Sequence, residues 1–115
     1  MSIPRSLRRE TVVIRRYLGS GAYGPVYGDA ETYGPPMRGV YVEPGFRRVT
    51  NAQGEEVVAS VTAVFGPEAE SVPPGSLVVW QGRTYRAIDV QPKRPGARTH
   101  HVEMVLQSTD EEAGL

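Results

Sequence analysis

Glycine and proline interrupt this chain so often that a helical fold is hard to build from it. The 115 residues include 13 glycines and 10 prolines, together a fifth of the chain, against about 12% in an average protein. Both residues are unfavourable inside helices and frequent in turns. The segments between them are short and contain runs of β-branched residues, as at 11–18. The sequence therefore predicts an all-β fold with many turns.

Six segments have the composition or the alternation of strands. They cover residues 11–18, 40–50, 55–65, 77–80, 84–90 and 99–107. The second and third flank a polar turn, and the fourth and fifth bracket a tight turn with Gly82, so each pair predicts a hairpin. Six strands joined by turns predict a small antiparallel β-barrel or sandwich.

Alternation within the strands predicts which side chains face the core. In 55–65 the residues expected to face it are Val57, Ala59, Val61, Ala63 and Phe65, while Val58 and Val64 indicate that the opposite face is partly covered too. Trp80 and Tyr85 are also expected to pack in the core.

The length fits one domain that spans 1–115. We expect a basic N-terminal arm at 1–10, a β-barrel core at 11–107, and an acidic flexible tail at 108–115. The core includes a long loop at 19–39, directly after the first strand. Loops longer than about 12–15 residues in compact domains are usually functional or disordered.

This loop begins with a glycine-rich motif, because Gly19, Gly21 and Gly24 match the G-x-G-x-x-G pattern of protein kinases. The partners that such a motif needs are missing: the chain has one lysine, Lys93, far from the loop, and neither H-R-D nor D-F-G occurs. The Rossmann interpretation fails as well, because no helix is expected after the glycines. We therefore expect no nucleotide cofactor and no enzymatic activity.

The composition of the loop favours contact with protein. Residues 19–36 contain two acidic side chains and no basic one, so they are poorly suited to bind phosphate. Tyrosine offers a large contact area at a small entropic cost. We expect an inter-subunit or channel loop whose candidate residues are Tyr23, Tyr27, Asp29, Glu31 and Tyr33.

The two ends of the chain carry opposite charge although the net charge is zero. The acidic side chains Asp110, Glu111 and Glu112 lie near the C-terminus. The candidate docking arm consists of Arg5, Arg8, Arg9, Arg15 and Arg16. Such ends suit complementary contacts with other subunits, and the basic end also suits nucleic acid. Two solvated tails are the alternative.

Other chemistry has little support in the sequence. Adjacent His100 and His101 point to opposite faces of a strand, and His101 with Glu103 makes only two metal ligands. The chain has no cysteine and no apolar run near the ~18 residues of a membrane span. We expect no metal, no catalytic residue and no membrane contact. A single-strand nucleic-acid-binding barrel stays open as an alternative, with Arg83, Arg86 and Tyr85 on one hairpin and Lys93, Arg94 and Arg98 in the next loop.

The C-terminal half resembles the closing hairpin and last strand of phage head–tail connector proteins, the head-closure or "stopper" proteins of long-tailed phages. The segment is VPPGSLVVWQGRTYRAIDV, then a proline-containing turn, then THHVEMVL. The positions that carry the resemblance are Pro74, Gly75, Ser76, Val78, Gly82, Tyr85, Arg86, Ile88, Thr99, His100, His101, Glu103 and Leu106.

The resemblance implies a virion protein that is assembled in the host cytoplasm and forms a ring of twelve or six copies. The ring would dock beneath the portal and adaptor and above the tail terminator or tail tube, and it would retain packaged double-stranded DNA without sequence specificity. The loop at 19–39 is the best candidate for the gate or the subunit contact. A neighbouring connector ring, the adaptor or the tail terminator, is the alternative within the same assembly.

Overall fold

Seven strands form one antiparallel sheet in the computed structural model, which describes residues 9–35, 38–50, 54–93 and 101–109. The strands are β1 (Val12–Gly21), β2 (Gly24–Tyr33), β3 (Tyr41–Thr50), β4 (Glu56–Phe65), β5 (Leu77–Trp80), β6 (Arg83–Lys93) and β7 (His101–Ser108). A short 3-10 helix, η2 (Pro67–Ala69), lies between β4 and β5. The predicted all-β, antiparallel class is confirmed.

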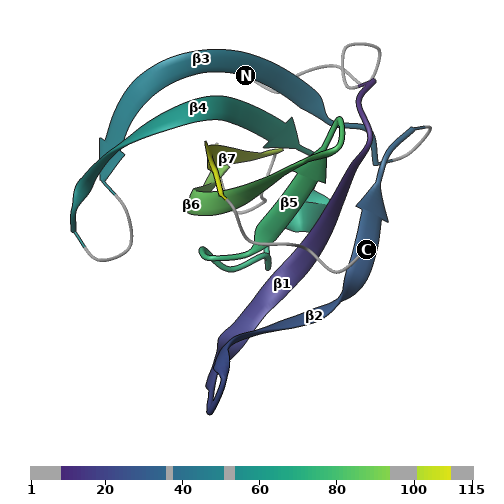
Figure 1. The fold of residues 1–115 in the computed structure, drawn as a ribbon. Helices are drawn as coiled ribbons and strands as arrows, with labels where there is room; N and C mark the ends of the chain where they lie inside the picture. The colour runs from purple at the N-terminus through teal and green to yellow at the C-terminus, as the bar shows by residue number, and fades with distance from the viewer. Residues whose placement is uncertain (1–8, 36–37, 51–53, 94–100, 110–115) are drawn as a thin grey trace.

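The sheet is open but strongly rolled. Its strands follow the order β2-β1-β5-β6-β7-β4-β3, so β2 and β3 are the two edge strands. Glu10 and Val40 exchange two backbone hydrogen bonds of 2.8 and 3.1 Å, which join the segment before β1 to the segment before β3. Figure 1 shows β3 and β4 arching over β6 and β7. The sheet is therefore close to a barrel without being a closed one.

The prediction of a long loop at 19–39 is wrong, because part of this segment forms the seventh strand. Residues 24–33 form β2, which pairs with β1 from Gly21↔Gly24 to Val12↔Tyr33. Glycine and proline lower the strand propensity of this segment, but backbone pairing with β1 depends on main-chain groups that every residue except proline can offer in full. Two register shifts in β1 accommodate the irregular stretch.

The other predicted hairpins are confirmed. β3 pairs with β4, and β5 pairs with β6. Gln81 and Gly82 connect Trp80 to Arg83 with φ values of 49° and 74°. Two positive φ values in a two-residue turn match the right-handed twist of the flanking strands, which explains the glycine at this position.

β6 continues beyond the predicted end at residue 90. Pro92 was expected in a turn, but it pairs with Val102 of β7, and Lys93 pairs with His101. β5 begins at Leu77, opposite Arg86, so the part of β6 beyond Arg86 has β7 as its one strand partner among the described residues. Proline lacks a backbone N–H, and it is tolerated at this position because β6 has a strand partner on one side alone there among the described residues.

The core lies inside the rolled sheet and follows the predicted alternation. Val61, Ala63 and Phe65 are buried, and so are Val102, Met104 and Leu106 of β7. The side chains of 57–60, which include the predicted core residues Val57 and Ala59, lie outside the described part of the structure. Burial of Val64 confirms that the second face of β4 is covered as well.

The two predicted aromatic core residues differ in depth. Tyr85 is buried, whereas Trp80 is half-buried and packs against the core cluster from its margin. The indole Nε1 of Trp80 donates to Glu10 Oε1 at 2.9 Å. This bond ties the start of the sheet to β5, next to the backbone bridge that Glu10 makes with Val40.

Candidate functional site

The β1–β2 hairpin leaves the sheet as a two-stranded ribbon. β1 pairs with β5 only from Val13 to Arg15. The next contact with this neighbour is made by Tyr17, whose backbone N–H donates to Ser76 Oγ at 3.0 Å. Farther out, β2 is the one strand partner of β1 among the described residues. We call residues 17–28 the ribbon; Figure 1 shows the β1–β2 end projecting from the rest of the sheet.

The glycines of the G-x-G-x-x-G motif shape the ribbon and its turn. Gly21 and Gly24 form the last cross-strand pair, so Ala22 and Tyr23 make up the turn between them. Gly24 has a φ of 109°, and Gly19, beside a register shift, has a φ of 124°. Side chains with a Cβ rarely adopt such values, so hairpin geometry alone gives these glycines a structural role.

The surface of the ribbon is apolar and uncharged. The exposed large hydrophobic side chains of the described chain all lie on it: Leu18 is 65% exposed, Tyr23 105% and Val26 46%. None of residues 17–28 is charged. An uncharged patch with exposed tyrosine and aliphatic side chains has the composition of the centre of a protein interface, from which charged residues are depleted.

Two glycines make room for the aliphatic side chains of the ribbon. A Cβ added to Gly28 would lie 3.8 Å from both terminal methyl carbons of Leu18, and one added to Gly21 would lie 3.1 Å from Val26 Cγ2. Leu18 and Val26 therefore lie over neighbouring backbone that carries no side chain. The result is a smooth apolar face on a thin hairpin.

An ion pair closes the base of the ribbon. Arg16 Nε donates to Glu31 Oε2 at 2.7 Å, and Arg16 Nη1 donates to Ser71 Oγ at 2.8 Å. The hydrogen bond from Arg16 lowers the pKa of the Glu31 carboxyl, and the same bond raises the pKa of the Arg16 guanidinium. Arg16, directly before the ribbon on β1, and Glu31 on β2 therefore compensate each other's charge.

A second arginine fixes the two strands of the ribbon to each other. Arg15 Nε donates to the carbonyl oxygen of Gly28 at 2.8 Å, and its Nη2 donates to that of Tyr27 at 3.4 Å. The rings of Tyr17 and Tyr27 lie on the same part of the hairpin with centroids 6.1 Å apart. These contacts hold the ribbon at its exit from the sheet.

The structure separates the five loop residues that the sequence grouped together. Tyr23 is fully exposed at the turn and Asp29 is exposed on β2, as a contact surface requires, while Tyr27 is half-buried. Glu31 is held by Arg16. Tyr33 lies in the core rather than on a loop.

Tyr33 is only 2% exposed and contacts four neighbours, one of which is Arg16, whose Nη2 donates to the Tyr33 hydroxyl at 3.4 Å. Its ring meets that of Phe65 edge to face, with centroids 5.6 Å apart, and the Arg38 guanidinium lies 4.0 Å from its centroid. Its hydroxyl donates to Glu31 Oε1 at 3.3 Å. Burial raises the pKa of the Tyr33 hydroxyl. The expected contact role of Tyr33 is therefore corrected to a structural one.

The structure also separates the residues of the predicted docking arm. Arg5 and Arg8 lie outside the described residues, and Arg9 is exposed just before the bridge at Glu10. Arg15 and Arg16 belong to β1 and bond within the chain, because β1 brings them beside β2. They are therefore corrected from an arm to the body of the sheet. The acidic residues 110–112 of the tail also lie outside the described residues.

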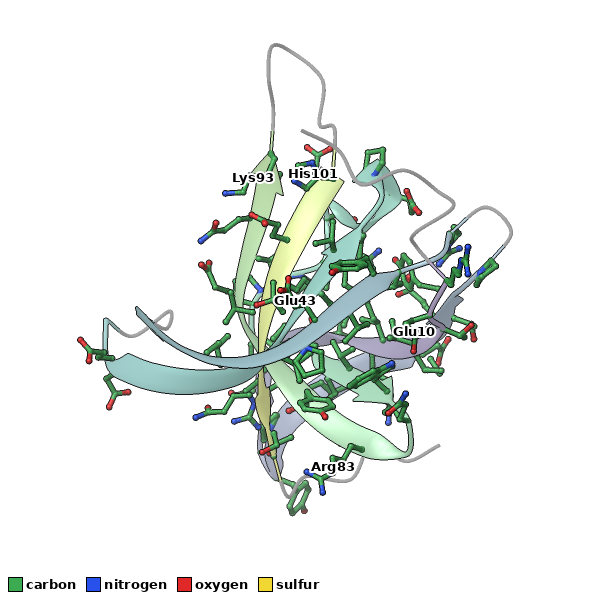
Figure 2. All side chains as sticks on the ribbon, turned by 90° about the horizontal axis from the view of Figure 1, so that it is seen from above. Glu10, Glu43, Arg83, Lys93 and His101 are labelled. Carbon is green, nitrogen blue, oxygen red and sulfur yellow. The ribbon has the colours of Figure 1, made fainter. Side chains whose placement is uncertain are left out.

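The polar group at the far end of β6 and β7 is an ion pair rather than a metal site. Lys93 Nζ lies 3.2 Å from Glu103 Oε2, and Figure 2 shows Lys93 next to His101, its cross-strand partner. His100 lies outside the described residues. Within the described ranges no group of three or more His, Cys, Asp or Glu is arranged to hold a metal ion.

Sequence reasoning missed Leu18 and Val26. Leu18 ends an apolar run that normally indicates a buried strand, and Val26 fell in the segment expected to be a loop. No local signal shows that β1 extends beyond its pairing with β5. The combination of apolar residues with an uncharged glycine-rich stretch is the one signal that could have pointed to them.

No helix in the described part of the chain is long and apolar enough to span a membrane. No protein-family model matches the chain, and no curated protein is significantly similar to it in sequence.

Proposed function

We propose that this chain is a structural protein of a phage virion, a head-closure or stopper ring at the junction between portal and tail. In this role it retains packaged DNA and presents the surface to which the tail attaches. It acts by assembly, without catalysis, cofactor or metal.

The apolar ribbon is the observation that carries the proposal. Leu18, Tyr23 and Val26 stand in solvent on an element that projects from the sheet. A soluble chain rarely keeps such residues exposed together unless another protein covers them. Subunits that assemble into a ring need projecting contact elements of this kind, because each copy must reach a different surface of its neighbour.

The residues that resemble the connector family support the same proposal. Those that the structure describes lie on β5, β6 and β7, which are consecutive neighbours in the sheet, or in the turns before and after β5, while Thr99 and His100 lie outside the described residues. Gly75 and Gly82 have φ values of 94° and 74°, so the glycines of the pattern mark turns before and after β5. The resemblance thus corresponds to a continuous three-stranded part of the fold.

The expected partners follow from the proposed place in the virion. Twelve or six copies form the ring, the portal and adaptor lie above it, and the tail terminator or tail tube lies below it. Packaged double-stranded DNA passes through the channel. An uncharged ribbon suits a conduit of this kind, because phosphate binding and its counterion release require lysine and arginine.

The test is reconstitution on DNA-filled, tailless heads that carry portal and adaptor. Purified chain is added, and the portal vertex is imaged by cryo-electron microscopy while nuclease resistance of the DNA is followed. We expect additional ring density at the vertex and a gain in resistance. Heads that bind no chain would contradict the proposal.

Two variants make this test specific. Leu18→Ser with Val26→Ser is expected to weaken vertex binding, because the ribbon loses its aliphatic surface. Arg83→Ser, at an exposed position at the start of β6, is the matched control and is expected to bind like the parent chain. Density at the tail side or in the position of the adaptor would favour the neighbouring ring components instead.

A single-strand-binding barrel is the competing function, and salt separates the two. Binding to single-stranded DNA that weakens steeply between about 50 and 200 mM salt would favour it. Absence of binding at low salt would discard it.

A further inference from the structure

Three strands of the sheet combine an open edge with a proline. β2 and β3 are the edge strands, and β6 beyond Ala87 has β7 as its one strand partner among the described residues. Pro25 lies on β2, Pro44 on β3 and Pro92 on β6. An open edge presents backbone N–H and C=O groups with which another chain can pair. Because proline has no N–H, its effect on such pairing depends on the side of the strand to which its nitrogen points.

The nitrogen of Pro25 points to the outer edge of β2. Gly21 and Gly24 flank the two-residue turn and form its closing, hydrogen-bonded pair. Hydrogen-bonded and non-hydrogen-bonded pairs alternate along an antiparallel ladder, so the next pair, Ser20 with Pro25, is a non-hydrogen-bonded one. The backbone groups of such a pair point away from the partner strand. Pro25 therefore leaves a donor missing where a further strand would pair with β2.

The nitrogen of Pro92 points to the open side of β6. The N–H of Thr109, directly after β7, donates to the carbonyl oxygen of Thr84 at 3.1 Å, so Thr109 points its backbone groups toward β6. This direction alternates along β7, and Val102 therefore points toward β4 instead. Val102 is the partner of Pro92, which makes the two a non-hydrogen-bonded pair and turns Pro92 away from β7.

The nitrogen of Pro44 points outward from β3. Val40 exchanges backbone N–H and C=O bonds with Glu10, outside the ladder that β3 forms with β4. Alternation from Val40 directs Tyr41 toward β4, where it pairs with Val64, and directs Pro44 to the outer side. Pro44 is also exposed and lies directly before a register shift in this ladder. Irregularities of this kind turn an edge away from further pairing.

We propose that Pro25, Pro44 and Pro92, the three edge prolines, close these stretches of the sheet to the addition of a strand from another chain. A strand laid along any of them would meet a position without a donor and would form an interrupted ladder. Other proteins would then contact these parts of the sheet through side chains rather than through backbone pairing. The inference concerns the free chain and does not depend on the proposed function.

Simple tolerance of proline at a strand edge is the alternative to an obstructing role. In that case a residue with an N–H at the same position would leave the association of the chain unchanged. If the prolines obstruct pairing, the same replacement opens an edge that other chains can use. The two interpretations therefore differ in the effect on association and not in the effect on the fold.

One open stretch lies outside this inference. Residues 56–60 of β4 precede its pairing with β7, which runs from Val61 to Phe65, and they include no proline. This stretch is the same in the parent chain and in variants at the three edge prolines. A difference in association between them therefore reports on the prolines alone.

Threonine at the three positions tests the proposal, because it supplies the missing N–H and has a high strand propensity. The triple variant Pro25→Thr, Pro44→Thr, Pro92→Thr and the three single variants are incubated beside the parent chain. Loss of monomer is followed by size-exclusion chromatography, and cross-β association by thioflavin T fluorescence. At about 100 µM protein we expect the triple variant to lose monomer at least about 10-fold faster than the parent chain, with part of this increase in each single variant.

Pro67→Thr is the matched control, because Pro67 is exposed and begins η2 instead of lying on a strand edge. It is expected to lose monomer at the rate of the parent chain. Urea unfolding separates edge pairing from lost stability, and the unfolding midpoints of the edge variants are expected to stay close to that of the parent chain. The proposal is overturned by a triple variant that stays as monomeric as the parent chain, by losses of monomer that follow the losses of stability, or by a control that associates as fast as the edge variants.

Discussion

Tyr33 and Tyr23 lie ten positions apart in one hairpin, and the structure predicts opposite consequences for the same substitution. Tyr33 is 2% exposed and Tyr23 is 105% exposed. Replacement by leucine keeps a large apolar side chain at both positions. It removes the aromatic ring and the hydroxyl, so the difference between the variants measures what these groups contribute in the core.

The expected cost at Tyr33 comes mainly from three of its four contacts, since the hydrogen bond from Arg16 Nη2 is long, at 3.4 Å. The edge-to-face pair with Phe65 contributes about 0.5–1.5 kcal/mol. The contact with the Arg38 guanidinium contributes about 0.5–1 kcal/mol, and the hydroxyl hydrogen bond to Glu31 contributes about 1 kcal/mol. We therefore expect Tyr33→Leu to lower the free energy of unfolding by about 3 kcal/mol, and Tyr23→Leu to change it by less than about 0.5 kcal/mol.

Urea unfolding followed by the fluorescence of Trp80, the single tryptophan, gives both values. Tyr33→Phe separates the hydroxyl from the ring and is expected to cost about 1 kcal/mol. If Tyr33→Leu and Tyr23→Leu cost the same within about 0.5 kcal/mol, the placement of Tyr33 in the core is refuted.

Three further predictions concern the base, the turns and the start of the sheet. The folded-state pKa of the Glu31 carboxyl is lowered, so Glu31 contributes to the free energy of unfolding above its unfolded pKa, near 4.5, and this contribution is lost as the pH falls. The stability difference between the parent chain and Glu31→Gln should therefore shrink from pH 7 to pH 3. A constant difference would contradict the ion pair. Gly75 has a φ of 94°, and an added Cβ would meet a tyrosine ring at 3.3 Å, so Gly75→Ala should lower the melting temperature. Gly45→Ala is the control: an added Cβ there has nothing within 4 Å, so the melting temperature should stay nearly unchanged. A larger loss at Gly45 than at Gly75 would contradict this geometry. Glu10→Ala should cost about 1–2 kcal/mol and shift the fluorescence of Trp80, because the indole loses its acceptor; an unchanged spectrum and stability would show that this bond is absent in solution.

Several elements could be predicted from the sequence because their information is local. The turn at Gln81 and Gly82 needs two positive φ values, which glycine supplies at one of the two positions. Alternation at Val102, Met104 and Leu106 predicts a strand with one buried face wherever that strand lies in the sheet. The fold class and the hairpins β3–β4 and β5–β6 depend on signals of this kind.

The strand at residues 24–33 could not be predicted in this way. Its glycines and Pro25 argue for a loop, and it becomes a strand because β1 offers a backbone edge to pair with. Tyr33 then enters the core and Glu31 meets Arg16, whereas Tyr23 stays in solvent. The sequence analysis had grouped these residues by their composition, which does not determine where each residue lies once β2 pairs with β1.

Local preference thus determined that this chain builds strands and where most of its turns fall. Tertiary structure alone decided that β1 extends beyond its pairing with β5, and therefore that Leu18 and Val26 lie on the surface. The physical reason is that burial depends on which segments become neighbours. That choice is made by pairings between residues far apart in the chain, such as Val13 with Val79, and no short window of sequence contains both partners.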